Sequence, residues 1–176
     1  MKLYVTRHGQ TELNVKRKVC GLTNIPLTEK GKAQAKALSA KLATKKIDLI
    51  ICSPLKRARM TAEIINESTH CNIIVDDRII EQNYGVYEKT DWDDEKFLAA
   101  KKAFFCKFPG GESIVQVAHR AYNLLDEIKE KYDGKTILIV SHGGVCRVID
   151  TYFNDRTNNE FFDFQLDNCG LKEYEL

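Results

Sequence analysis

Short apolar runs recur along the chain at the length of single strands. Continuous runs predict buried strands at 2–6, 48–53 and 135–141. A shorter strand with its exit is predicted at 72–80, and the tail 161–176 has the pattern of one or two strands. Because the three main runs are continuous and do not alternate with polar residues, they indicate strands that are buried on both faces of a sheet.

Between these strands, the apolar residues follow the 3.6-residue period of helices. The predicted helices span 27–44, 54–69, 112–132 and 144–153. Thr28 has the position of an N-cap, and Pro54 falls in a first helical turn, where proline is tolerated. Strands that alternate with helices predict an α/β fold, a three-layer α/β/α sandwich around a mostly parallel sheet.

The segment at about 86–108 interrupts this alternation. It is polar, aromatic and irregular, with one helix predicted around 93–106, and we expect it to form a short helical cap. No linker, repeat or low-complexity stretch divides the chain. We therefore expect residues 1–176 to form one domain with a cap-like insertion.

Composition and charge exclude several classes of protein. The net charge of +2 and the pI of about 8.1 are too mild to indicate nucleic-acid or membrane binding. No apolar run approaches the roughly 18 residues of a membrane span, and the N-terminus opens directly into a strand, without room for a signal peptide. The six cysteines are scattered and form no C-x-x-C pair, which predicts reduced thiols in a cytoplasmic protein.

Polar side chains follow the three main strands at the points where they end. Arg7 and His8 follow the first strand, Arg57 lies just beyond the second, and His142 and Gly143 follow the third. The carboxyl ends of parallel strands meet at one edge of an α/β sheet, where ligands bind. The sequence therefore predicts that two histidines and two arginines converge there, beside a glycine that lets the backbone approach a ligand.

A phosphoryl group fits this set of residues. Arginine offers planar, paired donors to phosphate oxygens, and the helix that starts near Gly144 presents its positive end to the same place. A nucleoside-triphosphate site of the P-loop type is not indicated, because the chain lacks G-x-x-x-x-G-K-[ST].

Five motifs appear in one order along the chain: TRHGQTELN, SPLKRARMTA, a lone Glu81 in IIEQNYG, FPGGES and VSHGG. In this order they resemble the histidine phosphatase superfamily, which has the phosphoglycerate-mutase-like fold. The resemblance covers nearly the whole chain. R-H-G alone is a weak signal, whereas its combination with S-P-x-x-R-A-x-x-T-A and S-H-G-G is specific.

The resemblance implies a role for each matching residue. His8 would be the nucleophile and carry a phosphohistidine, and Glu81 would be the general acid. The phosphoryl oxygens would be held by the residues Arg7, Asn14, Arg57, His142 and Gly143. Gly21, beside Cys20, occupies the place where the family's loop touches substrate. No metal and no cofactor is implied.

Some of these assignments have alternatives in the sequence. Asn14 has the pattern of a simple helix cap, and Glu81 could be an ordinary surface carboxylate. Arg57 competes with Lys56 and Arg59 for the phosphate. A zinc site at the two histidines lacks a third ligand with suitable spacing.

The resemblance favours a phosphomonoester hydrolase, active on a small metabolite of the sugar-phosphate or α-ribazole-phosphate type, as a monomer or homodimer. A cofactor-dependent phosphoglycerate mutase is the first alternative, although the mutases carry a longer insertion between the motifs that contain Glu81 and Pro109. A non-catalytic module that binds phosphorylated ligands is the second. The stretch GVYEKTDWD also departs from the family's G-x-W-E-G pattern, which leaves the geometry of the cap open.

Overall fold

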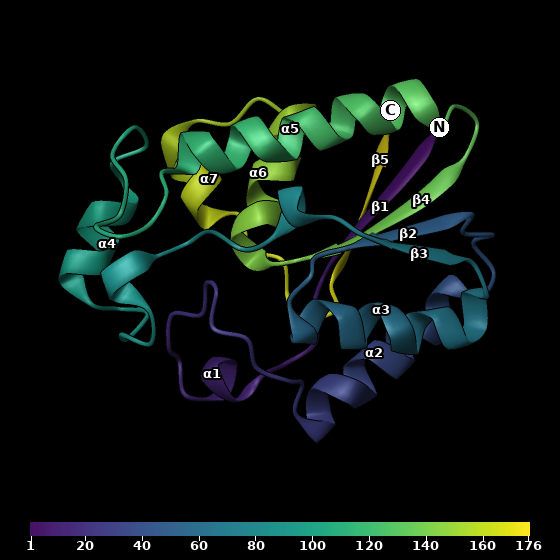
Figure 1. Ribbon diagram of the computed structural model, residues 1–176, viewed down its shortest axis with the longest axis horizontal. Coiled ribbons are helices and arrows are strands. Elements are labelled where there is room, and N and C mark those ends of the chain that lie inside the picture. The colour runs from purple at the N-terminus through teal and green to yellow at the C-terminus, as the bar shows by residue number, and fades with distance from the viewer.

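The computed structural model describes residues 1–176 and is organised around one five-stranded sheet (Figure 1). The strands lie in the order β3-β2-β4-β1-β5. Their bounds are β1 (Lys2–Arg7), β2 (Leu49–Cys52), β3 (Asn72–Val75), β4 (Thr136–Ser141) and β5 (Leu171–Glu175). β3, β2, β4 and β1 pair in parallel, and β5 is antiparallel to β1. The prediction of a mostly parallel sheet is confirmed.

Helices cover both faces of the sheet, which confirms the three-layer sandwich. α2 (Glu29–Leu42) and α3 (Lys56–Thr69) lie on one face, and α5 (Ile114–Lys131) and α6 (Gly143–Phe153) lie on the other (Figure 1). The shorter helices are α1 (Glu12–Val15), α4 (Glu95–Lys101), α7 (Asn158–Asp163) and the 3-10 turns η1 (Asp77–Ile79) and η2 (Gly85–Tyr87). None of the helices combines the length and the apolar character needed to cross a bilayer.

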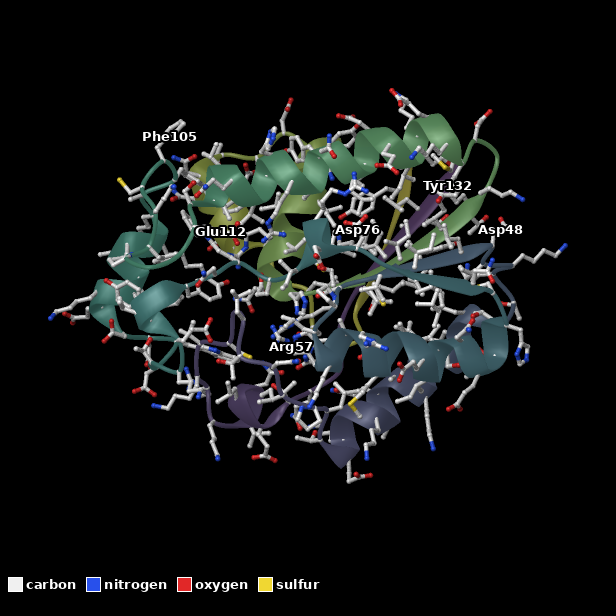
Figure 2. The ribbon with its side chains drawn as sticks, in the orientation of Figure 1. Asp48, Arg57, Asp76, Phe105, Glu112 and Tyr132 are labelled. Carbon is white, nitrogen blue, oxygen red and sulfur yellow. The ribbon has the colours of Figure 1, made fainter.

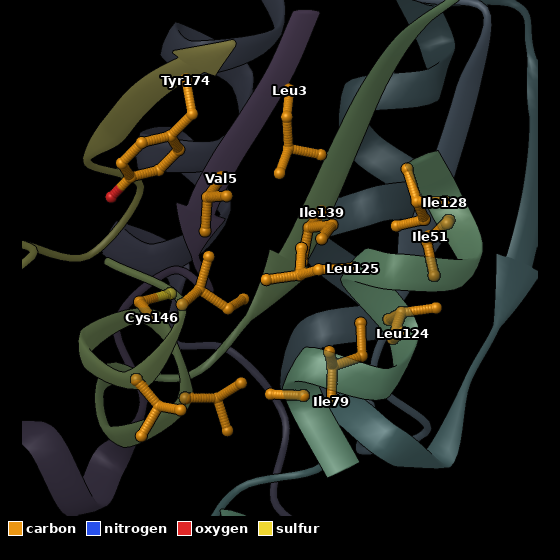
Figure 3. Close-up of a cluster of buried hydrophobic side chains, with 14 of the residues drawn as sticks. Leu3, Val5, Ile51, Ile79, Leu124, Leu125, Ile128, Ile139, Cys146 and Tyr174 are labelled. Atoms are coloured by element: carbon orange, nitrogen blue, oxygen red, sulfur yellow. The ribbon is translucent and has the colours of Figure 1, made fainter. Parts of the chain in front are cut away.

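Successive residues of each strand point to opposite layers, so the sheet takes part in two separate cores. Leu3, Val5 and Ile139 pack with α5 and α6 in a cluster of 19 buried residues (Figure 3). Their neighbours Tyr4 and Leu138 pack on the other face in a cluster of 11 that includes α2 and α3. The continuous apolar runs therefore reflect burial on both faces.

The segment 86–108 lies beside the carboxyl ends of the parallel strands, next to α1 (Figure 1). It has a small core of its own, made of Val19, Tyr84, Phe97 and Phe108. Its helix, α4, ends at Lys101, so the helix predicted around 93–106 is shorter than expected. The chain after Lys101 continues in turns.

Part of the prediction for the tail is wrong. Residues 158–163 form α7, and only β5 is a strand. Thr157 caps this helix, and the side chain of Glu160 accepts from the backbone N–H of Thr157, so a capping box starts the helix. This T-x-x-E signal is visible in the sequence and competes with the aromatic run that suggests a strand.

Candidate active site

The register of the sheet brings three strand ends together. Arg7 of β1 pairs with Ser141 of β4, and Cys52 of β2 pairs with Val140 of β4. The residues after these strands therefore emerge side by side, as the sequence predicts. The ring centroids of His8 and His142 lie 5.2 Å apart.

His8 is buried, and one of its two ring nitrogens carries no proton. Its Nδ1 lies 2.7 Å from the carbonyl oxygen of Gly9, so Nδ1 carries the proton and donates it there. Nε2 in turn accepts the Nε–H of Arg57 at 3.1 Å. Burial, followed by the charges of Arg57 and Arg7, holds the pKa of His8 well below its usual value of 6.5. The imidazole is therefore neutral at physiological pH, with a lone pair on Nε2.

Arg57 lies at the centre of the molecule, at the start of α3 (Figure 2), and is fully buried. Its Nε–H is shared between His8 and Nδ1 of His142, which lies 3.2 Å away. Its terminal nitrogens donate to the backbone carbonyls of Cys20, Gly21 and Thr23. Arg57 thus connects both histidines to the loop after α1.

The neighbours of Arg57 in the sequence do not compete for this position. Arg59 is exposed and lies 3.8 Å from Glu63, and Lys56 is exposed at the surface of α3. Pro54 and Leu55 precede α3, which begins at Lys56, so Arg57 falls in its first turn. Of the three cations that the sequence offers, Arg57 alone is buried beside the two histidines, and its role toward a phosphate stays a prediction.

His142 is the N-cap residue of α6, although its side chain does not cap the helix. Its Nε2 lies 2.6 Å from Oγ of Ser53, and since Nδ1 accepts from Arg57, Nε2 carries the proton. Burial, followed by the charge of Arg57, lowers the pKa of His142 well below 6.5. His142 is therefore also neutral.

Arg7 carries the one unsatisfied buried polar side-chain atom of the protein. One terminal nitrogen donates to the carbonyl of Leu166 at 3.1 Å, but Nε has no partner. A buried N–H without an acceptor is unfavourable by about 1–3 kcal/mol. Gly143 leaves the space next to this guanidinium open, because a Cβ at Gly143 would lie 3.5 Å from Nε of Arg7. The atom is therefore a donor that lacks its acceptor.

Glu81 is buried, with 5% of its surface exposed, so it is not a surface carboxylate. Its Oε1 accepts the backbone N–H of Gln82 at 2.9 Å, and its Oε2 accepts that of Gly144 at 3.1 Å. A Cβ at Gly144 would lie 2.6 Å from Oε1, so the first turn of α6 needs a glycine there. These contacts fix the carboxyl group beside α6.

A cavity of about 400 Å³ opens over these residues. Its lining includes the predicted residues Arg7, His8, Asn14, Glu81 and Gly143. Arg57 and His142 are fully buried, and neither they nor Gly21 line the cavity. The structure thus divides the predicted set into a cavity surface and a supporting layer.

Asn14 and Gly21 both have structural duties. Asn14 completes the capping box of α1, where its Oδ1 accepts the backbone N–H of Thr11 at 3.0 Å. The helix-cap alternative is therefore present in the structure, although Asn14 also borders the cavity. Gly21 permits a close approach, because a Cβ there would lie 2.2 Å from Oε1 of Glu88 and 2.4 Å from the carbonyl of Gln82.

Several residues of the site are missed by sequence reasoning. Asn168 donates to the backbone carbonyl of His8 at 2.9 Å, and Lys101 and Arg147 also line the cavity. Arg147 lies four residues after Gly143, on the same face of α6, and this spacing is a signal that the sequence contains. Nothing in the local pattern marks Lys101 or Asn168.

No group of three or more histidine, cysteine, aspartate or glutamate side chains is placed to hold a metal ion. All six cysteines are free. Burial raises the pKa of the Cys20 thiol, the cysteine that borders the cavity.

Comparison with known proteins is consistent with this geometry. Residues 3–176 match the family model of the histidine phosphatase superfamily (branch 1). Phosphoserine phosphatase 1 of Hydrogenobacter thermophilus is 32% identical over 97% of this chain and 84% of its own length. A protein named "Probable phosphoglycerate mutase GpmB" of Escherichia coli O139:H28 is 35% identical over 81% of this chain and 70% of its own.

Solved structures show the same fold. YhfR of Bacillus stearothermophilus superposes with a TM-score of 0.90 at 29% identity, over 99% of this chain and 91% of its own. The α-ribazole phosphatase of Shigella flexneri superposes with a TM-score of 0.87 at 26% identity, over 100% and 91%. The match over nearly every residue, together with the strand-end site, shows that the chain belongs to the histidine phosphatase superfamily (branch 1).

Proposed function

We propose that this protein is a phosphomonoester hydrolase that works through a phosphohistidine on His8. The observation that carries the proposal is that a neutral, buried His8 and an Arg7 with an unpartnered Nε–H line the same cavity. The first supplies a nucleophilic nitrogen, and the second supplies a donor for the oxygens of a phosphoryl group.

In the first step, Nε2 of His8 attacks phosphorus as the bond to the leaving oxygen breaks. The carbonyl of Gly9 holds the proton on Nδ1, so the reacting nitrogen keeps its lone pair. Glu81 gives a proton to the leaving oxygen, and the product alcohol departs. Arg7 and Asn14 border the cavity and bind the equatorial oxygens. The Nε–H of Arg57, which Nε2 of His8 and Nδ1 of His142 share, leaves Nε2 as that nitrogen bonds to phosphorus and stays on His142.

In the second step, water attacks the phosphohistidine. Glu81, now a carboxylate, takes a proton from that water, the N–P bond breaks, and inorganic phosphate leaves. The electron pair of the N–P bond returns to Nε2. No metal is needed, because the arginines and the N-terminus of α6 supply the positive charge.

The substrate is proposed to be a small phosphorylated metabolite, in keeping with a cavity of about 400 Å³. Sugar phosphates and α-ribazole phosphate remain candidates from the sequence. The relatives add a third kind of candidate, because one of them is named as a phosphoserine phosphatase.

The second candidate function is a phosphoglycerate mutase, which is favoured by the names of relatives at 35% identity. A mutase must protect the phosphohistidine from water until it is transferred. The short segment 86–108 leaves the cavity open to water, which favours hydrolysis. A non-catalytic binding module is less favoured, because binding alone does not require a neutral histidine and a buried carboxyl group in one site.

The test is release of phosphate from a panel of phosphomonoesters, with a chelator present, by the wild type and by His8→Ala. We expect chelator-resistant turnover that falls by at least about a thousandfold in His8→Ala, because loss of the nucleophile removes the covalent route. His119→Ala is the matched control, since His119 is exposed on α5. Activity that survives in His8→Ala would contradict the nucleophile. Interconversion of 3- and 2-phosphoglycerate with a 2,3-bisphosphoglycerate primer would select the mutase.

A further inference from the structure

The lining of the cavity carries more positive charge than its surroundings neutralise. Besides Arg7, its cationic residues are Lys18, Lys101, Lys102 and Arg147, whereas Glu81 is the one carboxylate in the whole lining. Lys18 pairs with Asp91 at 2.7 Å. No acidic side chain pairs with Lys101 or Arg147.

Arg147 is held in place by contacts that leave its terminal nitrogens free. Its Nε donates to the carbonyl of Phe164 at 3.1 Å, and its guanidinium lies 5.4 Å from the ring centroid of Phe161. The two contacts come from the segment after α6, so the guanidinium is oriented before any ligand enters. A planar fork fixed in this way suits a carboxylate.

Lys101, on α4, brings a second charge to the same cavity. Its Nζ lies 5.7 Å from the ring centroid of Phe97 on α4 and has no hydrogen-bond acceptor. Burial, followed by the charge of Arg147, lowers the pKa of Lys101 to about 8. The proximity of two partly buried cations is unfavourable without an anion between them.

We propose that Lys101 and Arg147 form a second anion site, which binds a carboxylate on the leaving group of the substrate. The phosphoryl group lies at Arg7 and His8 in the same cavity, so the substrate carries a phosphoryl group and a carboxylate. The substrate class is then the phosphomonoester of a small hydroxy acid. Sugar phosphates and α-ribazole phosphate have uncharged leaving groups and would leave both cations unpaired.

This inference rests on the proposed hydrolase function, and two pairs of esters test it separately. O-phosphoserine differs from O-phosphoethanolamine by one carboxylate, and 3-phosphoglycerate differs from glycerol 3-phosphate by a carboxylate in place of CH₂OH. For the wild type, we expect kcat/KM to favour the acid in each pair by about 10- to 100-fold, the range for a charge-assisted hydrogen bond.

Variants of Lys101 carry the test, because Arg147 also holds the segment at Phe164. Lys101→Met should lower the preference for the acid by about tenfold in both pairs. Lys101→Glu should reverse it for phosphoserine against phosphoethanolamine, since both probes carry the amine and the new carboxylate repels only the carboxylate of phosphoserine. Lys96→Met is the matched control: Lys96 is exposed on α4 and does not line the cavity, so the preference should persist.

The preference for the acid can also be measured without turnover, as the ratio of the binding constants of the two esters of each pair to His8→Ala, by calorimetry. A wild-type preference near one, or a preference that Lys101→Met and Lys101→Glu leave unchanged, would overturn the second anion site. If the wild type hydrolyses no ester while His8→Ala binds the acids selectively, the second anion site stands and the hydrolase proposal fails.

Discussion

The floor of the cavity and its rim are held in place by different kinds of contact. The floor, as we use the term, consists of Arg7, His8 and Glu81, which line the cavity, together with the fully buried Arg57 and His142, which do not. Each of these side chains makes at least one hydrogen bond of defined geometry. Three of the five come directly from strand ends whose register the sheet sets. A displacement of Arg57 would break several bonds at once, because its guanidinium contacts both histidines and three backbone carbonyls.

The rim consists of Trp92, Phe97, Leu98, Lys101, Arg147 and Phe162. Aromatic contacts hold much of the rim in place. One example is the edge-to-face contact of Phe97 with Tyr84, whose ring centroids lie 5.5 Å apart. Trp92 and Leu98 are exposed, at 39% and 40%. Aromatic packing tolerates small shifts that hydrogen bonds do not, so the difference suggests that the floor serves the chemistry and the rim serves the choice of substrate.

Glu81→Gln tests the difference between floor and rim most directly. Its effect on kcat should be the largest after that of losing the nucleophile. Removal of the proton donor should lower kcat by about 10²- to 10⁴-fold for alkyl phosphates. The loss should be much smaller for p-nitrophenyl phosphate, whose leaving group departs without a proton.

Single-turnover release of the two alcohols by Glu81→Gln measures this difference. Equal losses for both esters would show that Glu81 acts only by holding Gly144 and Gln82. A larger loss of kcat from Leu98→Ala at the rim than from Glu81→Gln at the floor would contradict the assignment of the chemistry to the floor.

The next effect concerns stability at acid pH and belongs to the floor alone. The pKa values of His8 and His142 are lowered in the folded protein, so below pH about 6.5 the unfolded chain takes up protons that the folded protein excludes. The free energy of unfolding should therefore fall as the pH falls below about 6.5, by up to about 1.4 kcal/mol per pH unit for each histidine.

Chemical denaturation between pH 7 and pH 5.5 measures this slope. His8→Ala should remove up to about half of the histidine contribution, whereas His119→Gln, at an exposed position on α5, should leave the slope as it is. An unchanged slope in His8→Ala would mean that the buried ring is not excluded from protonation.

The smallest effect on stability concerns the loop around Gly21, which connects the floor to the rim. Gly21 lies where Arg57 holds one side of the loop and Glu88 holds the other, through the backbone N–H of Leu22 and the hydroxyl of Thr23. Gly21→Ala would place a Cβ against Glu88 and the carbonyl of Gln82, which should lower the free energy of unfolding by about 1–3 kcal/mol.

Leu22→Ala is the control in the same loop, because it adds no atom and Leu22 is exposed. It should change stability by no more than about 0.5 kcal/mol. If Gly21→Ala lowered the free energy of unfolding no more than Leu22→Ala does, the loop would accommodate the added methyl group without strain. The contacts between floor and rim would then be less rigid than their hydrogen bonds suggest.

Much of the floor can be predicted from local sequence, and most of the rim cannot. The apolar runs at 2–6, 48–53 and 135–141 locate β1, β2 and β4 to within one residue at each end. The tail is harder, because the aromatic residues around 161–164 fit both a strand and the short helix α7. There a local capping box and contacts with the distant α5 core decide the outcome.

The sequence by itself determined the strands, the helices that alternate with them and the identity of the residues at the strand ends. It did so because burial on both faces leaves an unbroken apolar run, and because parallel strands deliver the residues at their carboxyl ends to one edge. Only the tertiary structure decided that one N–H of Arg57 serves both histidines and that Nε of Arg7 is left without a partner.

The tertiary structure also decided that Lys101 and Arg147 line the same cavity. These two side chains come from α4 and α6, which are separated by α5 and β4 in the chain. Their meeting depends on how each helix is rotated and docked, and those long-range contacts leave no periodic pattern in the residues nearby. A strand end is a local event that the sequence records, whereas the convergence of side chains from distant elements exists only once the layers have packed.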